Sequence, residues 1–328
     1  MLNAQYIKNY AKNLGADLVG IATMDRFEGA PPHADPRFVF PEAKACIVLA
    51  FRIPRGYYRG IEEGTCFATY TAMGYAGLNE VYAPMVLREL CCHIEDFGYE
   101  AVPMPNIYLR PSVTWTTQPE DPPVSLPVRE GYPRPDIMMD MRVAAYAAGL
   151  GEYGYSKVFL TPEFGPLQRF VALLTDADLE PDPIFEGKIC DRCKLCAKAC
   201  TGKAISMTEM DSITIAGHKC EFAKIDLYAC GDAYRGGNPE YNPFMFTGVE
   251  SIEGKGPQET MGWNYYNRHN PAIEGARGCM RECYIHLEKV GRLTKKFHAP
   301  FRKREPWKID REATKGQIVG QDPDKPLY

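Results

Sequence analysis

The spacing of hydrophobic and polar residues predicts helices interleaved with strands over about the first 180 residues. Apolar residues recur with a helical period in three segments, which cover residues 3–14, 71–97 and 136–148. Short apolar runs between them have the length and composition of strands and cover 17–22, 45–51, 157–161 and 169–175. This alternation predicts an α/β or α+β sandwich.

Glycine and proline mark where the predicted helices end or bend. Gly15 and Gly98 follow the first two helices and are expected to cap them. Pro84 is expected to kink the second helix. The residues assigned to one face of that helix are Val81, Met85, Leu90 and Ile94. The segment 103–135, rich in Pro and Thr, predicts a long loop of the kind that more often carries function than not.

A change in texture near residues 181–183 predicts a domain boundary. We expect a first domain at 1–184 and a cysteine-rich second domain at 185–290, with an insertion at about 231–275 that is rich in Gly, Asn and Pro. A basic C-terminal tail would follow at 291–328. It lacks apolar periodicity, so a solvated or subunit-wrapping tail is expected, with docking of an acidic partner as the alternative.

Charge and hydropathy exclude some classes of protein. The 328 residues carry a net charge of −4, which makes nucleic acid an unlikely main partner. No apolar stretch approaches the roughly 20 residues that a membrane helix needs. Residues 1–10 do not resemble a secretory signal. We therefore expect a cytoplasmic protein with no membrane partner.

Twelve cysteines in a chain expected to stay in a reducing compartment indicate metal ligation or redox chemistry. Four of them, Cys190, Cys193, Cys196 and Cys200, follow the spacing C-x2-C-x2-C-x3-C. This is the ligand spacing of [4Fe–4S] ferredoxins, in which the fourth cysteine binds the other cluster. A zinc knuckle is the alternative, although zinc favours paired C-x2-C units separated by a longer loop.

A second [4Fe–4S] cluster needs further cysteines, which occur downstream. Because ligation crosses over in two-cluster modules, Cys283 would complete the first cluster. The second cluster would be held by Cys200, Cys220, Cys279 and Cys230. The alternative is that Cys230 is a buried free thiol and the second cluster is three-ligated or absent. The remaining cysteines, expected to be small core residues, are Cys46, Cys66, Cys91 and Cys92.

A glycine motif at residues 149–154 matches the dinucleotide fingerprint G-x-G-x-x-G. That fingerprint requires a strand before it and a helix after it. The order predicted here is reversed, so we reject nicotinamide binding. The glycines still imply that the backbone closely approaches another strand or a flat ligand.

The order of motifs resembles that of the reductive dehalogenases and the related epoxyqueuosine reductases. The resemblance rests on residues 148–154 (Ala-Gly-Leu-Gly-Glu-Tyr-Gly), 159–166 (Phe-Leu-Thr-Pro-Glu-Phe-Gly-Pro), Thr175-Asp176 and the cysteine motif. It spans about residues 40–225 plus the pair Cys279 and Cys283. It implies a nitroreductase-like corrinoid-binding α/β domain followed by a ferredoxin-like domain with two [4Fe–4S] clusters, an α+β architecture.

The resemblance also implies a cofactor and its site. Cobalamin would lie between the two domains and receive electrons from the clusters. The residues expected to bind it are Gly149, Leu150, Gly151, Gly154, Tyr155, Ser156, Leu160 and Thr161. Asp136 takes the place of the polar residue that donates a proton or polarises the substrate, with Asp140 as the fallback. Arg169 and Tyr108 take the places of the basic residue and tyrosine over the corrin.

The resemblance therefore implies a reductive dehalogenase-like oxidoreductase, in which a low-potential donor such as ferredoxin or flavodoxin supplies the electrons. The substrate would be a small organic molecule in a pocket lined in part by the Pro-rich loop, with a homodimer as one candidate assembly. One alternative is an electron-transfer or activator protein without a substrate of its own. Another is a tRNA-modifying reductase, although residues 152–155 depart from the epoxyqueuosine reductase pattern.

Overall fold

The computed structural model describes residues 2–66, 69–104, 106, 126–135, 137–227, 229–230 and 278–307. Its centre is a four-stranded antiparallel sheet in the order β1–β2–β6–β3. The strands are β1 (Leu18–Thr23), β2 (Ala45–Arg52), β3 (Ala101–Met104) and β6 (Gln168–Thr175). The mixed α/β character expected from the sequence is confirmed.

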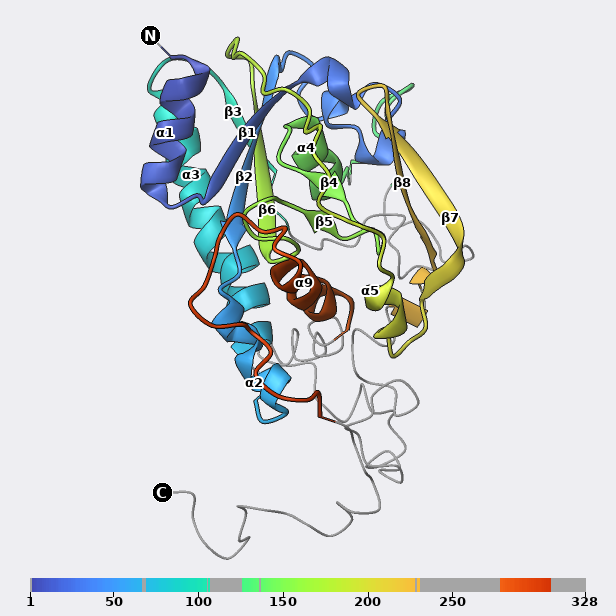
Figure 1. Ribbon diagram of the computed structural model, residues 1–328. Helices are drawn as coiled ribbons and strands as arrows, with labels where there is room; N and C mark the ends of the chain where they lie inside the picture. The colour runs from blue at the N-terminus through green and yellow to red at the C-terminus, as the bar shows by residue number, and fades with distance from the viewer. Residues whose placement is uncertain are drawn as a thin grey trace, which may run out of the picture.

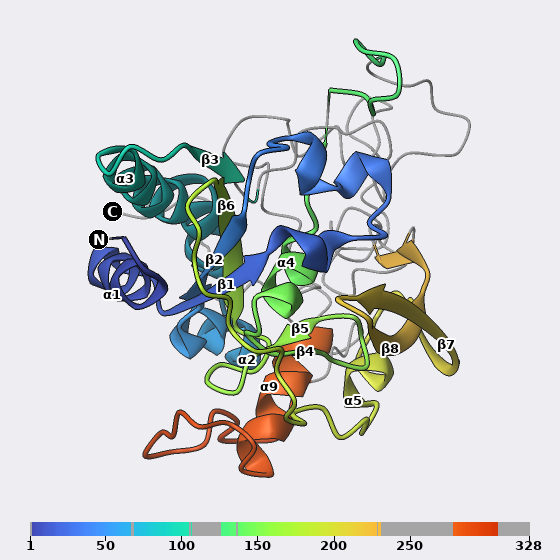
Figure 2. The ribbon, with the colours of Figure 1, turned by 90° about the horizontal axis from the view of Figure 1, so that it is seen from above.

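The two central strands are apolar on both faces because both faces of the sheet are covered. In β2, Ile47 and Leu49 pack into one core, whereas Cys46 and Val48 pack into the other. Helices α1 (Ala4–Leu14) and α3 (Ala83–Glu95) cover the first face, and α4 (Met141–Ala147) covers the second (Figures 1 and 2). The result is a sandwich of three layers.

The first predicted helix is confirmed: α1 is capped by Asn3 and ends at Gly15, whose φ of 118° is left-handed. The second predicted helix is divided into a π-helix, η5 (Tyr70–Tyr82), and α3. Pro84 lies at the junction of the two, in the first turn of α3, where the hydrogen bonding changes from the π to the α pattern.

The face assigned to the second helix was partly wrong. Leu90 and Ile94 are fully buried, but Val81 and Met85 are 56% and 64% exposed. The wider turn of the π-helix changes the periodicity before α3 begins, and the buried face of α3 includes Val86 and Leu87.

Helix α4 begins five residues later than expected, because Asp140 caps it by accepting a hydrogen bond from the N–H of Arg142 at 2.8 Å. A short turn links α4 to the small hairpin of β4 (Glu152–Tyr153) and β5 (Phe159–Leu160). The helix therefore precedes the glycine motif and β5 follows it, which is the reverse of the order that a dinucleotide fingerprint requires.

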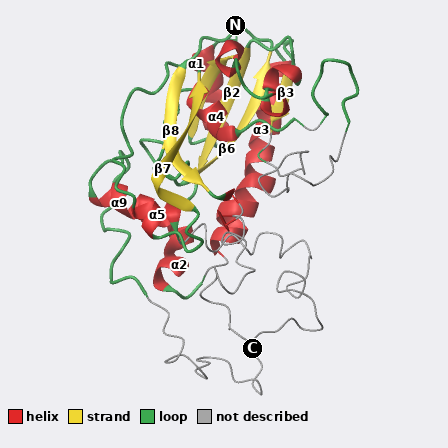
Figure 3. Ribbon diagram, turned by 90° about the vertical axis from the view of Figure 1, so that its right-hand side faces the viewer, coloured by secondary structure: helices red, strands yellow, loops and turns green. Residues whose placement is uncertain are grey.

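The cysteine-rich part contains α5 (Leu195–Lys198), the hairpin of β7 (Ile205–Ile215) and β8 (His218–Ile225), and α9 (Cys279–Lys289). These elements lie along one side and one end of the main sheet (Figures 1 and 3). Phe222 of β8 packs into the core beneath α4, and Tyr284 of α9 packs against Tyr58 and Ile61. The two expected domains thus share cores, and the boundary at 184 stays a prediction.

The described part of the C-terminal tail, 291–307, is not a solvated tail. Phe301 is 1% exposed and packs with Tyr284. Arg302 forms an ion pair with Glu62 of α2 (Arg59–Glu63) at 2.6 Å, and the indole of Trp307 donates to the carbonyl of Ile61 at 2.8 Å. Apolar anchors between the basic residues hold the segment down.

The four cysteines of the first predicted domain were expected to be small core residues. Cys46 and Cys91 are buried as expected, but Cys66 is exposed and Cys92 is half-buried, so the core assignment fails for Cys66 and Cys92.

Among the described residues, no helix is long and apolar enough to span a membrane.

Candidate metal centre and active site

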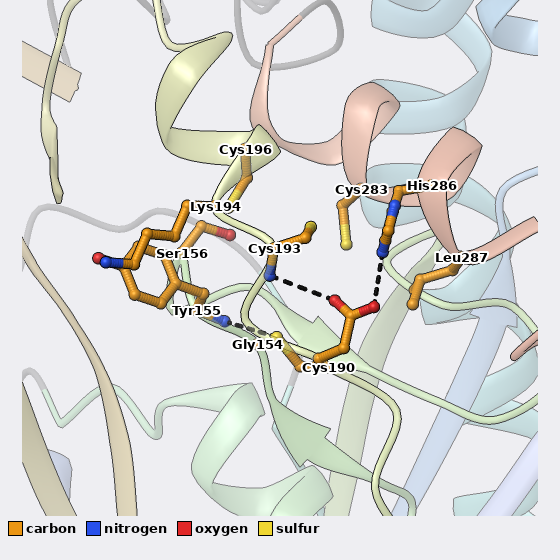
Figure 4. A pocket seen from close by; sticks show the side chains of 11 residues that line it. Gly154, Tyr155, Ser156, Cys190, Cys193, Lys194, Cys196, Cys283, His286 and Leu287 are labelled. Carbon is orange, nitrogen blue, oxygen red and sulfur yellow. Dashed lines mark hydrogen bonds and ion pairs between the residues drawn. The ribbon is translucent and has the colours of Figure 1, made fainter. Parts of the chain in front are cut away.

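Four cysteines from three segments line one cavity. Cys190 and Cys193 lie on the loop before α5, Cys196 lies on α5 and Cys283 lies on α9 (Figure 4). Arg192 and Lys194 have left-handed backbones, with φ of 58° and 61°, which curl the loop so that successive cysteines face the same space. These are the four residues expected to hold the first cluster.

The environment of these thiols suits a site that binds cations. Burial raises the pKa of Cys196 to about 11 and holds that of Cys283 well above its usual value. Thiols of this kind stay protonated at neutral pH unless a metal displaces the proton. The N–H of Tyr155 donates to the Cys190 sulfur at 3.3 Å, as peptide groups do to cluster ligands. The donor set therefore fits a [4Fe–4S] cluster.

A second group of cysteines lies beside the first. The charges of Cys200 and Cys230 both act on the pKa of Cys279, which burial raises strongly. Cys220 lies elsewhere among the described residues: it faces the hydroxyl of Tyr146, and its sulfur lies 3.9 Å from the carbonyl of His218. The structure thus brings together three of the four residues expected at the second cluster.

The glycine motif positions the cysteine loop. The carboxylate of Glu152 accepts hydrogen bonds from the N–H groups of Ile189 and Cys190, at 2.7 and 2.6 Å. Arg292 binds the carbonyls of residues 188 and 189 from the other side. Sequence reasoning assigned no role to Glu152, although its place inside the glycine motif was visible.

The glycines are explained by contacts within the chain. A Cβ on Gly149 would lie 2.1 Å from the carbonyl oxygen of Pro183, and one on Gly151 would lie 1.9 Å from that of Leu160. The close approach expected for these residues is therefore to protein backbone. Leu160 and Thr161 are fully buried, and Thr161 bonds to Gln168 at 3.3 Å. Leu150 packs at the edge of the core beneath α4.

Tyr155 and Ser156 of the predicted cofactor set line the cluster cavity with Gly154 (Figure 4). The hydroxyl of Tyr155 donates to the carbonyl of Ser206 at 2.9 Å, and Ser156 bonds to Cys196. In the described structure, these three residues therefore serve the cysteine site. Their part in corrinoid binding stays a prediction.

Asp191 and His286 lie at the edge of the same cavity. His286 Nε2 lies 2.7 Å from Asp191 Oδ2, and the N–H of Cys193 donates to Asp191 Oδ1 at 3.2 Å. Although burial opposes it, these bonds lower the pKa of Asp191. The two residues thus brace the loop against α9.

Arg169 lies at the centre of a second polar group, between β6 and the π-helix. Its guanidinium donates to the hydroxyl of Tyr70 at 2.5 Å and to the carbonyl of Gly74 at 3.3 Å. It also lies over the ring of Tyr75, 4.6 Å from the centroid. The tyrosine hydroxyl bonded to Arg169 is thus that of Tyr70, which sequence reasoning did not identify.

Tyr58 connects this polar group to the second group of cysteines. Its ring centroid lies 4.7 Å from that of Tyr70. Burial raises the pKa of Tyr58 well above its usual value, and Tyr70 and Cys279 raise it further. A cluster bound by Cys279 would therefore lie close to a phenol that remains neutral and to the Tyr70–Arg169 pair.

Two of the three expected catalytic residues, Asp136 and Tyr108, lie outside the described residues. The fallback Asp140 caps α4 and pairs with Arg142 at 3.0 Å. Neither of the two described cavities contains Arg169.

No family model matches the chain. It is similar to the tetrachloroethene reductive dehalogenase of Dehalobacter restrictus, with 38% identity over 105 residues. That match covers 28% of this chain and 19% of the enzyme, so the chain matches only about a fifth of its relative's length.

Solved structures of two enzyme classes also match in part. A catabolic reductive dehalogenase bound to 3-bromo-4-hydroxybenzoic acid gives a TM-score of 0.48 at 21% identity, over 70% of this chain and 28% of that one. The epoxyqueuosine reductase of Streptococcus thermophilus gives 0.38 at 16%, over 66% and 56%. The sequence match to the tetrachloroethene enzyme agrees with the resemblance seen in the motifs: over these 105 residues the chain is similar to a reductive dehalogenase.

Proposed function

We propose that this chain is a corrinoid-dependent iron–sulfur oxidoreductase of the reductive dehalogenase type, acting on a small organic substrate. The observation that carries the proposal is the pairing of Arg169 with Tyr70, linked through Tyr58 to the cysteine group at Cys279. Electron-transfer ligands and a proton-donating pair therefore lie together in a chain related to reductive dehalogenases.

Two [4Fe–4S] clusters would carry the electrons. Cys190, Cys193, Cys196 and Cys283 would hold one, as their shared cavity supports. Cys200, Cys230 and Cys279 would hold the second, and Cys220 as its fourth ligand stays a prediction, since Cys220 faces Tyr146 in the described structure. Since Cys279 and Cys283 lie one helical turn apart on α9, that helix would link the two clusters.

The corrinoid would supply a strongly reducing cobalt centre. In the net reaction a carbon–halogen bond is replaced by a carbon–hydrogen bond, which consumes two electrons and one proton and releases halide. The Tyr70 hydroxyl would supply the proton, and the positive charge of Arg169 would stabilise the phenolate that remains. Gly74 and Tyr75 hold the guanidinium in place.

The experiment compares Tyr70→Phe with Tyr75→Phe in protein loaded with clusters and cobalamin, with titanium(III) citrate as the electron donor and a panel of aryl and alkenyl halides. Tyr70→Phe removes the proposed donor and should lower turnover by about 10²-fold or more. Tyr75→Phe keeps a ring beneath Arg169 and should change turnover by less than about threefold. Equal turnover in the two variants would remove Tyr70 from the mechanism.

An electron-transfer protein without its own substrate is the second candidate. The observation that favours it is that the Arg169 guanidinium is bonded within the chain and lines neither described cavity. Equilibrium dialysis of the cluster-loaded protein with cobalamin separates the two candidates, since an electron carrier of this kind needs no corrinoid.

A further inference from the structure

A groove of about 750 Å³ lies between α9 and the segment 293–302. Its apolar lining residues include Leu195, Ile285, Leu293 and Phe297. Three lysines also line it, Lys289, Lys295 and Lys296, of which the first and last are exposed. The groove therefore combines apolar and basic side chains, as expected of a surface that binds an acidic protein.

The acidic residues of the groove are neutralised within the chain. Glu282 pairs with Arg302 at 2.6 Å, and Glu288 pairs with Arg55 at 2.6 Å. None of the three lysines has an ion-pair partner within the described ranges. Three positive charges without an ion-pair partner in the described part of the chain thus gather at one place, although Lys296 donates to the carbonyl of Gly291 and Lys295 lies over the ring of Phe164.

The groove adjoins the first cysteine site. His286 lines both the groove and the cavity that holds the four cysteines. Leu195, which also lines the groove, directly precedes the expected ligand Cys196. A redox centre carried into this groove would be separated from the cluster by little more than one layer of side chains.

We propose that this groove is the docking site of a small acidic ferredoxin, and that electrons enter the protein at the cluster of Cys190, Cys193, Cys196 and Cys283. In each encounter one electron leaves the reduced ferredoxin cluster and reduces this cluster from the 2+ to the 1+ state, with no proton transferred. A ferredoxin fits because it delivers single electrons and carries its cluster beneath a surface loop that a concave groove can receive. The inference rests on the proposed function for its direction of electron flow.

The test uses the cluster-loaded protein and a purified acidic 2[4Fe–4S] ferredoxin. Binding is measured by calorimetry and the rate of cluster reduction by anaerobic stopped flow, both at low and high salt. The test variant is Lys289→Glu with Lys296→Glu. The control is Lys12→Glu with Arg88→Glu, which changes the net charge equally on α1 and α3, away from the groove (Figures 1 and 2).

The groove variant should bind ferredoxin at least about 10-fold more weakly at low salt and be reduced correspondingly more slowly, with a smaller difference at high salt. The control should match the unmodified protein. Equal losses in both variants would show a non-specific charge effect and overturn the docking site. Efficient reduction by an acidic flavodoxin but not by ferredoxin would overturn the choice of partner.

Titanium(III) citrate separates failure of this inference from failure of the proposed function. A small chemical reductant does not need the groove, so the groove variant should be reduced by it at the unmodified rate. If substrate turnover occurs with titanium while ferredoxin does not bind, the docking inference alone is wrong. If turnover is absent with titanium and ferredoxin still binds at the groove, the proposed function is wrong.

Discussion

Replacing Glu62 with Gln should destabilise the helix that carries two of the cluster cysteines. Glu62 is buried, with its side chain 3% exposed, and it pairs with Arg281 and Arg302. Arg281 lies on α9 between Cys279 and Cys283 and is itself 6% exposed. Burial lowers the pKa of Arg281 to about 10, so the arginine remains charged at neutral pH.

The size of the effect follows from the charge left behind. Removing one partner of a buried ion pair costs about 3–5 kcal/mol, because the other charge stays buried without compensation. Glu282 remains 3.7 Å from Arg281, which places the cost near the lower end, about 3 kcal/mol. For a chain of 328 residues that corresponds to a fall in Tm of roughly 4 °C.

The assay is thermal unfolding of the cluster-loaded protein together with its iron content. The matched control is Glu63→Gln, since Glu63 is 20% exposed and its pairs with Arg59 and Arg304 should contribute less than about 1 kcal/mol. The double variant Glu62→Gln with Arg281→Gln should recover part of the loss, since no buried charge is left unpaired. Equal falls in Tm for Glu62→Gln and Glu63→Gln would refute the reasoning.

Three other outcomes are expected. Cys230→Ser should lower the iron content from about eight to about four atoms per chain, and an unchanged content would remove Cys230 from the ligands. Asp140→Asn should cost about 0.5–1 kcal/mol at pH 7, because Arg142 lowers the pKa of Asp140 although burial opposes it. The stabilisation by ionised Asp140 is present above the pKa of about 4 that the residue has in the unfolded chain, and it is lost at lower pH. The Tm difference between Asp140→Asn and the unmodified protein should therefore disappear at low pH. A difference that persists there would contradict the prediction. In cluster-loaded protein iodoacetamide should modify exposed Cys66 and spare Cys46, whose pKa burial raises to about 12, as peptide mapping would show.

The sequence was informative where one local pattern determines the structure. The apolar runs at 45–51 and 169–175 became β2 and β6 because a strand covered on both faces is apolar throughout. The spacing of Cys190, Cys193 and Cys196 likewise brings three thiols into one cavity with little help from the rest of the chain.

Prediction failed where distant segments decide the outcome. Tyr70 lies 99 residues from Arg169, and only the packing of the π-helix against β6 brings them together. The basic composition of 291–307 concealed the anchors Leu293 and Phe301, whose burial depends on α2 and α9. Val81 and Met85 were misplaced because a π-helix does not follow the α-helical period.

The most direct test of the central proposal is EPR spectroscopy of anaerobic protein reconstituted with iron, sulfide and hydroxocobalamin, before and after reduction with dithionite. We expect a protein-bound, base-off Co(II) signal together with the interacting signals of two reduced [4Fe–4S] clusters. Cluster signals without protein-bound cobalt would contradict the proposal and favour an electron-transfer protein.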